Sequence, residues 1–262
     1  MPTTYTHDIF GKEVYEQLPD EIKKVIRSGK SLYLTGLHGP DILFYHLPFL
    51  KNKIYDTGIQ MHQKESADFF CRAIVRYQEE PSDLTMAYIL GFGCHFILDS
   101  TCHPYVSEYE KSRGVSHAEI ETELDRYYME REGKNPFTYK PAVSICITKK
   151  GCETISKVLG GISEKQIYRC LRGMKFYTGL LVCKNETKRK VLLGLMKLLG
   201  CYPSMEGQIM RKEPDPACEI STDVLRHLYQ EALDEAVEAL KNLYDCMQKE
   251  GKLSERFNRN FE

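Results

Sequence analysis

Two runs of histidine and carboxylate residues at helical spacing constrain this chain more than any other feature of its sequence. His95, Asp99 and His103 stand at i, i+4 and i+8, and His117 and Glu121 repeat the step of four further along the chain. Each step of four residues drifts by only about 40° around a helix, so the three side chains of the first run can face one side. The sequence therefore predicts two consecutive helices that each carry a row of metal-ligating groups.

A bound metal ion is the simplest reason for such groups on the first helix. Phe92, Ile97 and Leu98 indicate that this helix belongs to the core. A buried carboxylate with two imidazoles costs several kcal/mol in desolvation unless something compensates it, and a metal ion does so. Nitrogen and oxygen ligands together favour zinc, or another borderline divalent metal, over calcium or magnesium. A single histidine would more often be an ordinary surface or core residue, so the prediction rests on the joint pattern.

The composition is that of one ordinary globular domain. Apolar residues make up 42% and charged residues 28% of 262 residues, which is long enough for one well-buried core. The formal net charge is −1, from 36 basic and 37 acidic side chains. The chain thus lacks the long-range field of a nucleic-acid-binding protein, and we expect no stable nucleic-acid partner. The oligomeric state stays open.

The N-terminal sequence and the cysteines predict a location inside the cell. The opening residues MPTTYTHDIF contain no basic segment, apolar run or small-residue cleavage site, so we expect no signal peptide and a cytoplasmic protein. The ten cysteines are scattered, and we expect reduced thiols rather than a disulfide framework. The longest apolar stretch, Leu84–Leu98, is interrupted and shorter than the roughly 20 residues of a membrane span. It predicts a buried core helix and no transmembrane segment.

Helical periodicity dominates the whole chain, which predicts the all-α fold class. Residues 30–60 mix Gly, Pro and Asp with aromatic residues and predict a structured loop, with one short helical turn at Ile42–Tyr45. Pro104 predicts the end of the long apolar helix. The predicted helices are Thr6–Leu18, Asp20–Ser28, Gln60–Glu79, Leu84–Cys102, a helix from Ser116 toward Gly133, Ser163–Cys183, Thr187–Leu199 and Thr222–Met247, with a poorly patterned connection at 134–150 and a long loop before the last helix.

The order of these motifs resembles the zinc-dependent bacterial phospholipase C family, whose fold the S1/P1 nucleases share. H-x3-D-x3-H at 95–103 is followed by H-x3-E at 117–121, and Gly39-Pro40-Asp41 and the isolated His62 precede both. The likeness covers about residues 5–125. It implies a single-domain helical bundle over residues 1–262 of the phospholipase C and P1 nuclease type. Its metal-binding half would span about 1–132 and its helical C-terminal half about 133–262, with two to three zinc ions at the bottom of a cleft.

The resemblance also implies a ligand set for each zinc ion. His62, His95 and Asp99, with Asp41, would surround the first ion. The second would be held by His103, His117 and Glu121, and the third by His7, with Asp99 as a bridge. In the family the third ion is also bound by an N-terminal Trp. This chain departs from that pattern, because it contains no Trp and begins Met1-Pro2-Thr3, where a processed amine at Pro2 or Thr3 would have to take its place.

Three side chains have more than one interpretation. Cys102 follows His95 by seven residues, within roughly 20° of the same helical direction, and would face the metal if the helix continued. Since Pro104 indicates that the helix ends there, we expect His103 to turn inward and bind instead. Asp41 is either a ligand or the base that deprotonates the attacking water. His38 is a weaker candidate for a phosphate contact.

These observations predict a zinc-dependent hydrolase that cleaves a phosphate ester, with a small phosphoester or a phospholipid as substrate. Clustered zinc ions neutralise phosphoryl oxygens and activate water, so such a site needs little basic charge from the protein. A 3′-nucleotidase or single-strand nuclease on the same fold is the first alternative. A metal-binding module with little catalytic activity is the second, because the N-terminal Trp is missing.

Overall fold

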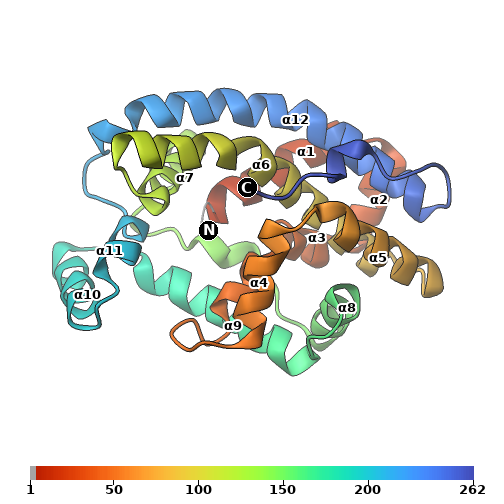
Figure 1. Cartoon of the computed structure of the whole chain (residues 1–262), viewed down its shortest axis with the longest axis horizontal. Helices are drawn as coiled ribbons and strands as arrows, with labels where there is room; N and C mark the ends of the chain where they lie inside the picture. The colour runs from red at the N-terminus through yellow and green to blue at the C-terminus, as the bar shows by residue number, and fades with distance from the viewer. Residues whose placement is uncertain (1–3) are drawn as a thin grey trace.

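The chain folds into one all-α domain. The computed structural model describes residues 4–262, apart from the side chains of residues 203 and 204, and every regular element in that range is a helix (Figure 1). The all-α prediction is therefore confirmed. The helices are α1 Thr4–Gln17, α2 Asp20–Ser28, α3 Lys30–Gly36, η1 Gly39–Tyr45, α4 Lys53–Gln63, α5 Ser66–Glu79, α6 Asp83–Arg113, α7 His117–Arg131, η2 Pro141–Ser144, α8 Lys149–Leu159, α9 Glu164–Leu181, α10 Glu186–Leu198, α11 Tyr202–Met205, η3 Glu206–Gln208, η4 Pro216–Cys218, α12 Glu219–Met247 and η5 Glu255–Phe257.

Helix α6 is the central element of the bundle. Its residues are buried without a break from Met86 to Ser100, on every face, and its main neighbours are α12 on one side and α3 on the other. Figure 1 shows α12 running along α6 and α7, with α3, α4, α8 and α9 on the opposite side. A helix that is apolar all round needs such a cover. The first run of candidate ligands therefore lies in the middle of the molecule.

The expected end of this helix at Pro104 is wrong. Helix α6 continues through Pro104 to Arg113, and Gly114 in the left-handed conformation follows it. Proline removes one backbone donor from the helix. However, Val106 and Tyr109 are buried beyond it, so packing on neighbouring helices holds the last turns in place. Tertiary burial outweighs the local cost of the proline.

The expected loop at residues 30–60 is also wrong for most of its length, because it contains α3, η1 and most of α4; the short helical turn predicted at Ile42–Tyr45 is confirmed as part of η1. Gly36 and Gly91 lie where α3 and α6 cross: a Cβ on Gly91 would come within 2.2 Å of the Tyr33 carbonyl oxygen, and one on Gly36 within 2.4 Å of the Tyr88 carbonyl oxygen. The glycine at 36 thus serves close helix packing. Asn52 begins α4 by accepting hydrogen bonds from the amides of Ile54 and Tyr55.

Two further boundaries differ from the prediction. The single helix expected at Gln60–Glu79 is divided between α4 and α5. At the break, Ser66 donates its backbone amide to the Arg259 carbonyl oxygen and its hydroxyl to the Phe257 carbonyl oxygen. The C-terminal tail thereby packs beside His62. Helix α8 begins at the end of the poorly patterned connection at 134–150, in a place where no helix was predicted, and it buries Cys152, Ile155 and Val158 at helical spacing.

No helix within residues 4–262 is long and apolar enough to cross a membrane. The ten cysteines form no disulfide in this range, and seven of them are buried. The core is built mainly from aliphatic and aromatic side chains of α1, α6, α7 and α12.

Candidate metal centre

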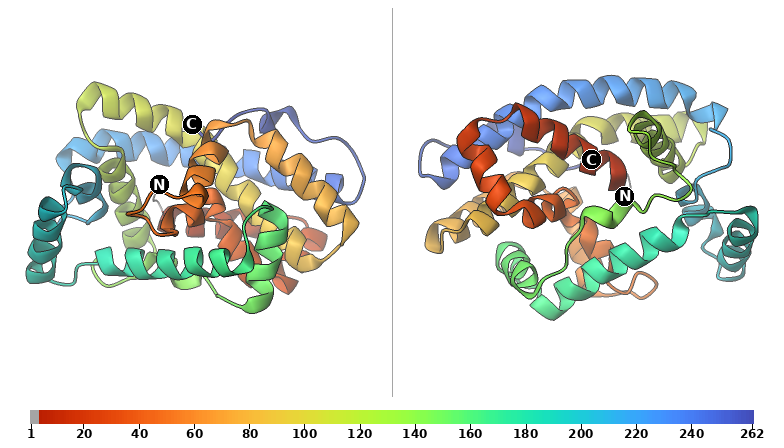
Figure 2. Two further views of the ribbon diagram at one scale, coloured as in Figure 1. Left: turned by 60° about the horizontal axis from the view of Figure 1, so that its bottom comes forward. Right: turned by 180° about the vertical axis from the view of Figure 1, so that it is seen from behind.

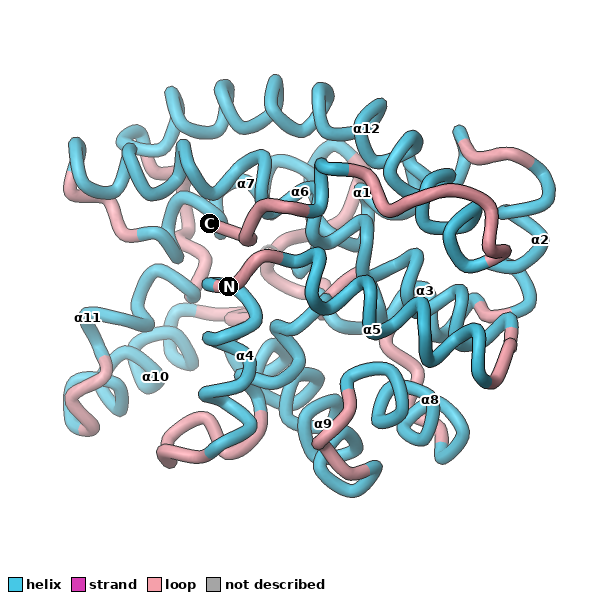
Figure 3. Tube along the Cα trace, turned by 45° about the vertical axis from the view of Figure 1, so that its right-hand side comes forward, coloured by secondary structure: helices cyan, strands magenta, loops and turns pink. Residues whose placement is uncertain are grey.

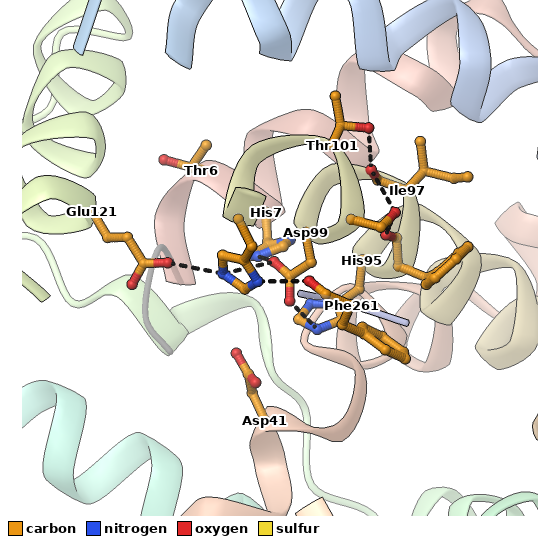
Figure 4. A network of polar contacts seen from close by, with 12 residues as sticks. Thr6, His7, Asp41, His95, Ile97, Asp99, Thr101, Glu121 and Phe261 are labelled. Atoms are coloured by element: carbon orange, nitrogen blue, oxygen red, sulfur yellow. Dashed lines mark hydrogen bonds and ion pairs between the residues drawn. The ribbon is translucent and has the colours of Figure 1, made fainter. Parts of the chain in front are cut away.

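The predicted ligands converge where α1, η1, α4, α6 and α7 meet. Seven of them are buried, and the eighth, His117, has a side chain that is 30% exposed. Figure 4 shows His7, His95 and Asp99 pointing toward one another, with the Asp41 carboxylate facing them from below and Glu121 from one side. The structure brings together His7, Asp41, His62, His95, Asp99, His103, His117 and Glu121.

Asp99 lies at the centre of this cluster. One of its carboxylate oxygens is 3.0 Å from Nε2 of His7, and the other is 3.1 Å from Nε2 of His95. The nearest imidazole nitrogens of His62 and His103 follow at 3.9 and 3.8 Å. Four imidazoles from three helices thus surround one carboxylate, which is the position expected of a residue shared between metal ions.

Two other carboxylates have imidazole partners of their own. Oε1 of Glu121 is 3.2 Å from Nε2 of His103 and 3.0 Å from Nε2 of His117. Oδ1 of Asp41 is 3.1 Å from Nε2 of His62. Adjacent ligands of a tetrahedral zinc ion lie about 3.3 Å apart, given zinc–ligand distances near 2.0 Å. The separations observed here are close to that value.

The described side chains form three groups whose ligand atoms all lie within 4.8 Å of one another. His103, His117 and Glu121 form one group, as the resemblance implied for the second zinc ion. The other two are Asp41, His62 and His95, and His7, His95 and Asp99. The group of Asp41, His62 and His95 lacks Asp99, which the resemblance placed at the first ion. The other group pairs His7 with Asp99, as the resemblance implied for the third ion, and adds His95 to them.

The chemistry of these atoms fits a cation. Nδ1 of His62 lies 2.8 Å from the Gly58 carbonyl oxygen, and Nδ1 of His103 lies 2.8 Å from that of Phe261. Nδ1 therefore donates to a backbone carbonyl oxygen in both rings, which leaves Nε2 beside the carboxylates, where its lone pair would be available to a metal ion. Nε2 of His95 and Oδ1 of Asp41 are buried without a hydrogen bond. Zinc ions in the three groups would satisfy these electron pairs, so the residues fit the metal.

The cluster keeps its carboxylates ionised. Burial alone would raise the pKa of Asp41, but the contact with His62 and the charge of His95 lower it to about 2. The pKa of Asp99 likewise falls well below its ordinary range because the charges of His103 and His95 outweigh burial. For Glu121, the neighbouring His117 and His103 have the same effect on the pKa. Ionised carboxylates are what a metal site requires.

The histidines respond in two opposite ways. Burial lowers the pKa of His95, although Asp99 partly opposes this. His103 is buried too, but Asp99 and Glu121 outweigh the desolvation and raise its pKa to about 9. Without metal, the cluster would therefore hold a proton on His103 at neutral pH, and metal binding would release it.

The 3₁₀ helix η1 brings Asp41 to this cluster through Gly39. This glycine has a φ of +45°, which favours residues without a side chain. A Cβ there would lie 2.1 Å from Cδ2 of His95, so no other residue fits without moving that ring. The Gly39-Pro40-Asp41 sequence was part of the family resemblance. The close approach of Gly39 to the His95 ring explains why its first residue is a glycine.

Two supporting contacts were not predicted from the sequence. Asp125 on α7 accepts hydrogen bonds from the amides of Tyr5 and Thr6 and from the Thr6 hydroxyl, which fixes the start of α1 next to His7. Burial raises the pKa of Asp125 to about 7 against these hydrogen bonds. The second contact is that of the Phe261 carbonyl oxygen with His103. Asp125 follows Glu121 by four residues, so helical spacing could have placed it on the same side of α7. No sequence feature indicated that the C-terminal tail would contact His103.

The remaining candidates lie outside the cluster. His103, and not Cys102, reaches His117 and Glu121, although the helix does not end at Pro104; burial raises the pKa of the Cys102 thiol, which disfavours the thiolate form that binds metals. His38 is 1% exposed, and burial lowers its pKa to about 3, so it does not offer a phosphate contact. The amine considered at Pro2 or Thr3 lies outside the described residues.

A cavity of about 450 Å³ connects the cluster to the surface. His62, His103 and His117 lie on its inner side, and Phe44 and Tyr55 provide an apolar wall. A substrate entering this cavity would meet three imidazoles from three different helices, and the buried carboxylates behind them.

Comparison with known protein families agrees with this arrangement. The profile of the family described as zinc dependent phospholipase C matches residues 6–165, about three-fifths of the chain. The chain belongs to the zinc-dependent phospholipase C family. Membership in this family confirms the resemblance of the motifs and supports a zinc-dependent phosphoester hydrolase. No curated protein and no solved structure gives a significant match.

The family match and the ligand cluster coincide in the chain. The match begins one residue before His7 and ends just inside α9, so it contains all eight candidate ligands. Helices α10 and α12 lie beyond it. Helix α12 covers α6, whereas α10 stands apart from the ligands (Figure 1).

Proposed function

We propose that the protein is a zinc-dependent hydrolase that cleaves the phosphate ester of a phospholipid. One observation carries this proposal: imidazole nitrogens and carboxylate oxygens lie at zinc-ligand separations, several without a hydrogen bond, beside a cavity that opens to the surface. Such a cluster in the core has no structural use without a cation, because unpaired buried polar atoms cost free energy. Family membership supports the choice of zinc and of a phosphoester.

Each residue has a defined task in this proposal. Two to three zinc ions would be held by the three groups, with Asp99 between them. Bound zinc supplies a Lewis acid for the phosphoryl oxygens and lowers the pKa of water to about 7. The carbonyl oxygens of Gly58 and Phe261 orient the rings of His62 and His103. The walls of the cavity then limit how the ester approaches.

A phospholipid suits the surroundings of the cluster better than a nucleic acid. Phe44 and Tyr55, which wall the cavity, also line a second groove of about 540 Å³ whose other side chains are mostly aliphatic and aromatic. The surface next to the site is thus shaped for acyl chains. The expected cytoplasmic location, and with it an intracellular substrate, stays a prediction.

Hydrolysis assays test the proposed activity. The zinc-loaded protein is expected to hydrolyse p-nitrophenyl phosphorylcholine and short-chain phosphatidylcholine, and to leave single-stranded DNA and 3′-nucleotides intact. Turnover of nucleotides alone would favour the nuclease alternative. Zinc binding without turnover of any of these substrates would indicate the metal-binding module and contradict the proposal.

The Asp41→Asn variant tests the role of this carboxylate in the same assays. We expect kcat to fall by about a hundredfold or more, because both a ligand and a general base contribute at least that factor. The zinc content separates the two roles. A loss of zinc identifies Asp41 as a ligand, whereas full zinc content with a lost acid limb in the pH–rate profile identifies the base. Unchanged kcat would exclude both.

A further inference from the structure

Helix α10 carries an apolar face that the bundle does not cover. Val191, Leu195, Leu198 and Leu199 are 56%, 48%, 82% and 72% exposed, and their spacing places them on one side of the helix. Within α10 only Met196 is buried, and the main helical neighbour is the short α11. A contiguous exposed apolar surface of this kind marks an interaction site more often than chance.

The loop between η1 and α4 continues this surface. Leu47, Phe49 and Leu50 are 48%, 60% and 62% exposed. Phe49 and Pro48 line one wall of the 540 Å³ groove, and Leu195 and Leu199 line another. Figures 2 and 3 show the loop and α10 at the same end of the molecule. We call residues 47–53 and 184–199, which include α10, together the docking face.

The docking face is positively charged, although the whole chain is nearly neutral. Residues 182–200 contain five basic side chains and one acidic side chain, Glu186, in a chain whose net charge is −1. Among the basic ones, Lys184, Lys190 and Lys197 are exposed, and Lys51 and Lys53 extend the charge to the loop. Exposed leucines bordered by lysines are the pattern of helices that lie in the plane of a membrane interface.

We propose that the docking face binds the surface of an anionic phospholipid membrane. The leucines of α10 and the side chains of residues 47–50 would enter the acyl boundary, and the lysines would contact anionic headgroups. A second copy of the chain fits less well, because two such faces would bring like charges together. The proposal rests on the proposed function in one respect: the membrane is also the source of the substrate.

The groove explains why this face lies where it does. It begins between the loop and α10 and shares Phe44 and Tyr55 with the cavity at the ligand cluster. A lipid leaving the membrane at the docking face would therefore keep its acyl chains on apolar side chains while its phosphate approaches the cluster. The groove and the cavity thus lie on either side of the same two aromatic side chains.

Vesicle co-sedimentation of the zinc-loaded protein tests this proposal. Wild-type protein is expected to bind phosphatidylcholine vesicles that contain phosphatidylglycerol, and to bind less as salt is added. The Val191→Glu/Leu198→Glu variant changes two exposed residues that do not line the groove. It should bind about tenfold more weakly or worse, because it removes apolar insertion and adds repulsion. The Lys184→Gln/Lys190→Gln variant should lose binding only where phosphatidylglycerol is present.

A matched control and an independent readout decide the outcome. Val75→Glu changes a residue that is 54% exposed on α5, a helix at the opposite end of the molecule from α10 (Figure 1), and should bind like wild type. Hydrolysis of soluble p-nitrophenyl phosphorylcholine should be equal in all variants that fold. Absent wild-type binding, equal losses in the control, or a dimer that the α10 variant breaks would each overturn the proposal. Vesicle binding without any hydrolysis would instead support the docking face and contradict the proposed activity.

Discussion

Asp99→Ala is expected to lower phosphoester hydrolysis by about a thousandfold or more and to remove most of the bound zinc. Asp99 is the carboxylate that contacts His7 and His95 directly and lies within 4 Å of His62 and His103. Its loss takes a ligand oxygen from the group of His7 and His95 and removes the central carboxylate that lies beside the other two groups. A metal ion contributes several kcal/mol to transition-state stabilisation, and each 1.36 kcal/mol is a factor of about ten in rate.

Zinc analysis of the purified variant and kcat/KM on p-nitrophenyl phosphorylcholine measure this effect. Asp99→Asn keeps the shape of the side chain and removes its charge, so the variant should fold and still lose zinc. Asp83→Ala, in the first turn of the same helix, serves as the control and should keep both zinc and activity. Full zinc content in Asp99→Asn would mean that the carboxylate only hydrogen-bonds the imidazoles.

The spacing of the ligands could be predicted because a helix fixes the direction of its side chains. His95, Asp99 and His103 lie on one side of α6, as the steps of four require. His117 and Glu121 meet through the same rule on α7. The proximity of ligands within one helix could therefore be predicted without knowledge of the rest of the fold.

The positions of α3 and of the end of α6 could not be predicted from local signals. Gly36 is a helix breaker by propensity, yet it lets α3 approach α6 at Gly91. Pro104 removes a hydrogen bond, yet burial of Val106 and Tyr109 holds the helix beyond it. In both places the deciding contact comes from a distant part of the chain.

The supporting contacts of the site could not be predicted from the sequence for a related reason. Phe261 contacts His103 across 158 residues through a backbone carbonyl oxygen, and any residue type has such an oxygen. The side chain of Phe261 packs on His62 and His95, which holds the tail against the ligands. A sequence pattern identifies residues with particular side chains. It does not identify a backbone carbonyl oxygen that folding brings close to the site.

Chelation of zinc should destabilise the protein and reverse the pH dependence of its stability between pH 6.5 and 8.5. In the metal-free protein the pKa of His103 is raised from 6.5 to about 9 by Asp99 and Glu121, despite burial, and that of His62 is raised as well. A raised folded-state pKa adds stability that is complete below the unfolded value of 6.5 and is lost as pH rises toward 9. The loss amounts to a few kcal/mol at most, since one pKa unit is about 1.4 kcal/mol.

The zinc-bound protein should respond in the opposite direction, because zinc binds deprotonated imidazole and its affinity rises with pH. Thermal unfolding with and without chelator, at several pH values in this range, measures both slopes. His103→Gln removes the group with the raised pKa, so the metal-free variant should lose less stability as pH rises. Burial raises the pKa of the thiols in the core, so they stay protonated in the folded protein. Ionisation of these thiols in the unfolded chain near the upper end of this range lowers stability equally with and without zinc, and it does not alter the difference between the two slopes. Parallel slopes with and without chelator would mean that His103 does not exchange a proton for metal, and the group of His103, His117 and Glu121 would then lose its interpretation as a zinc site.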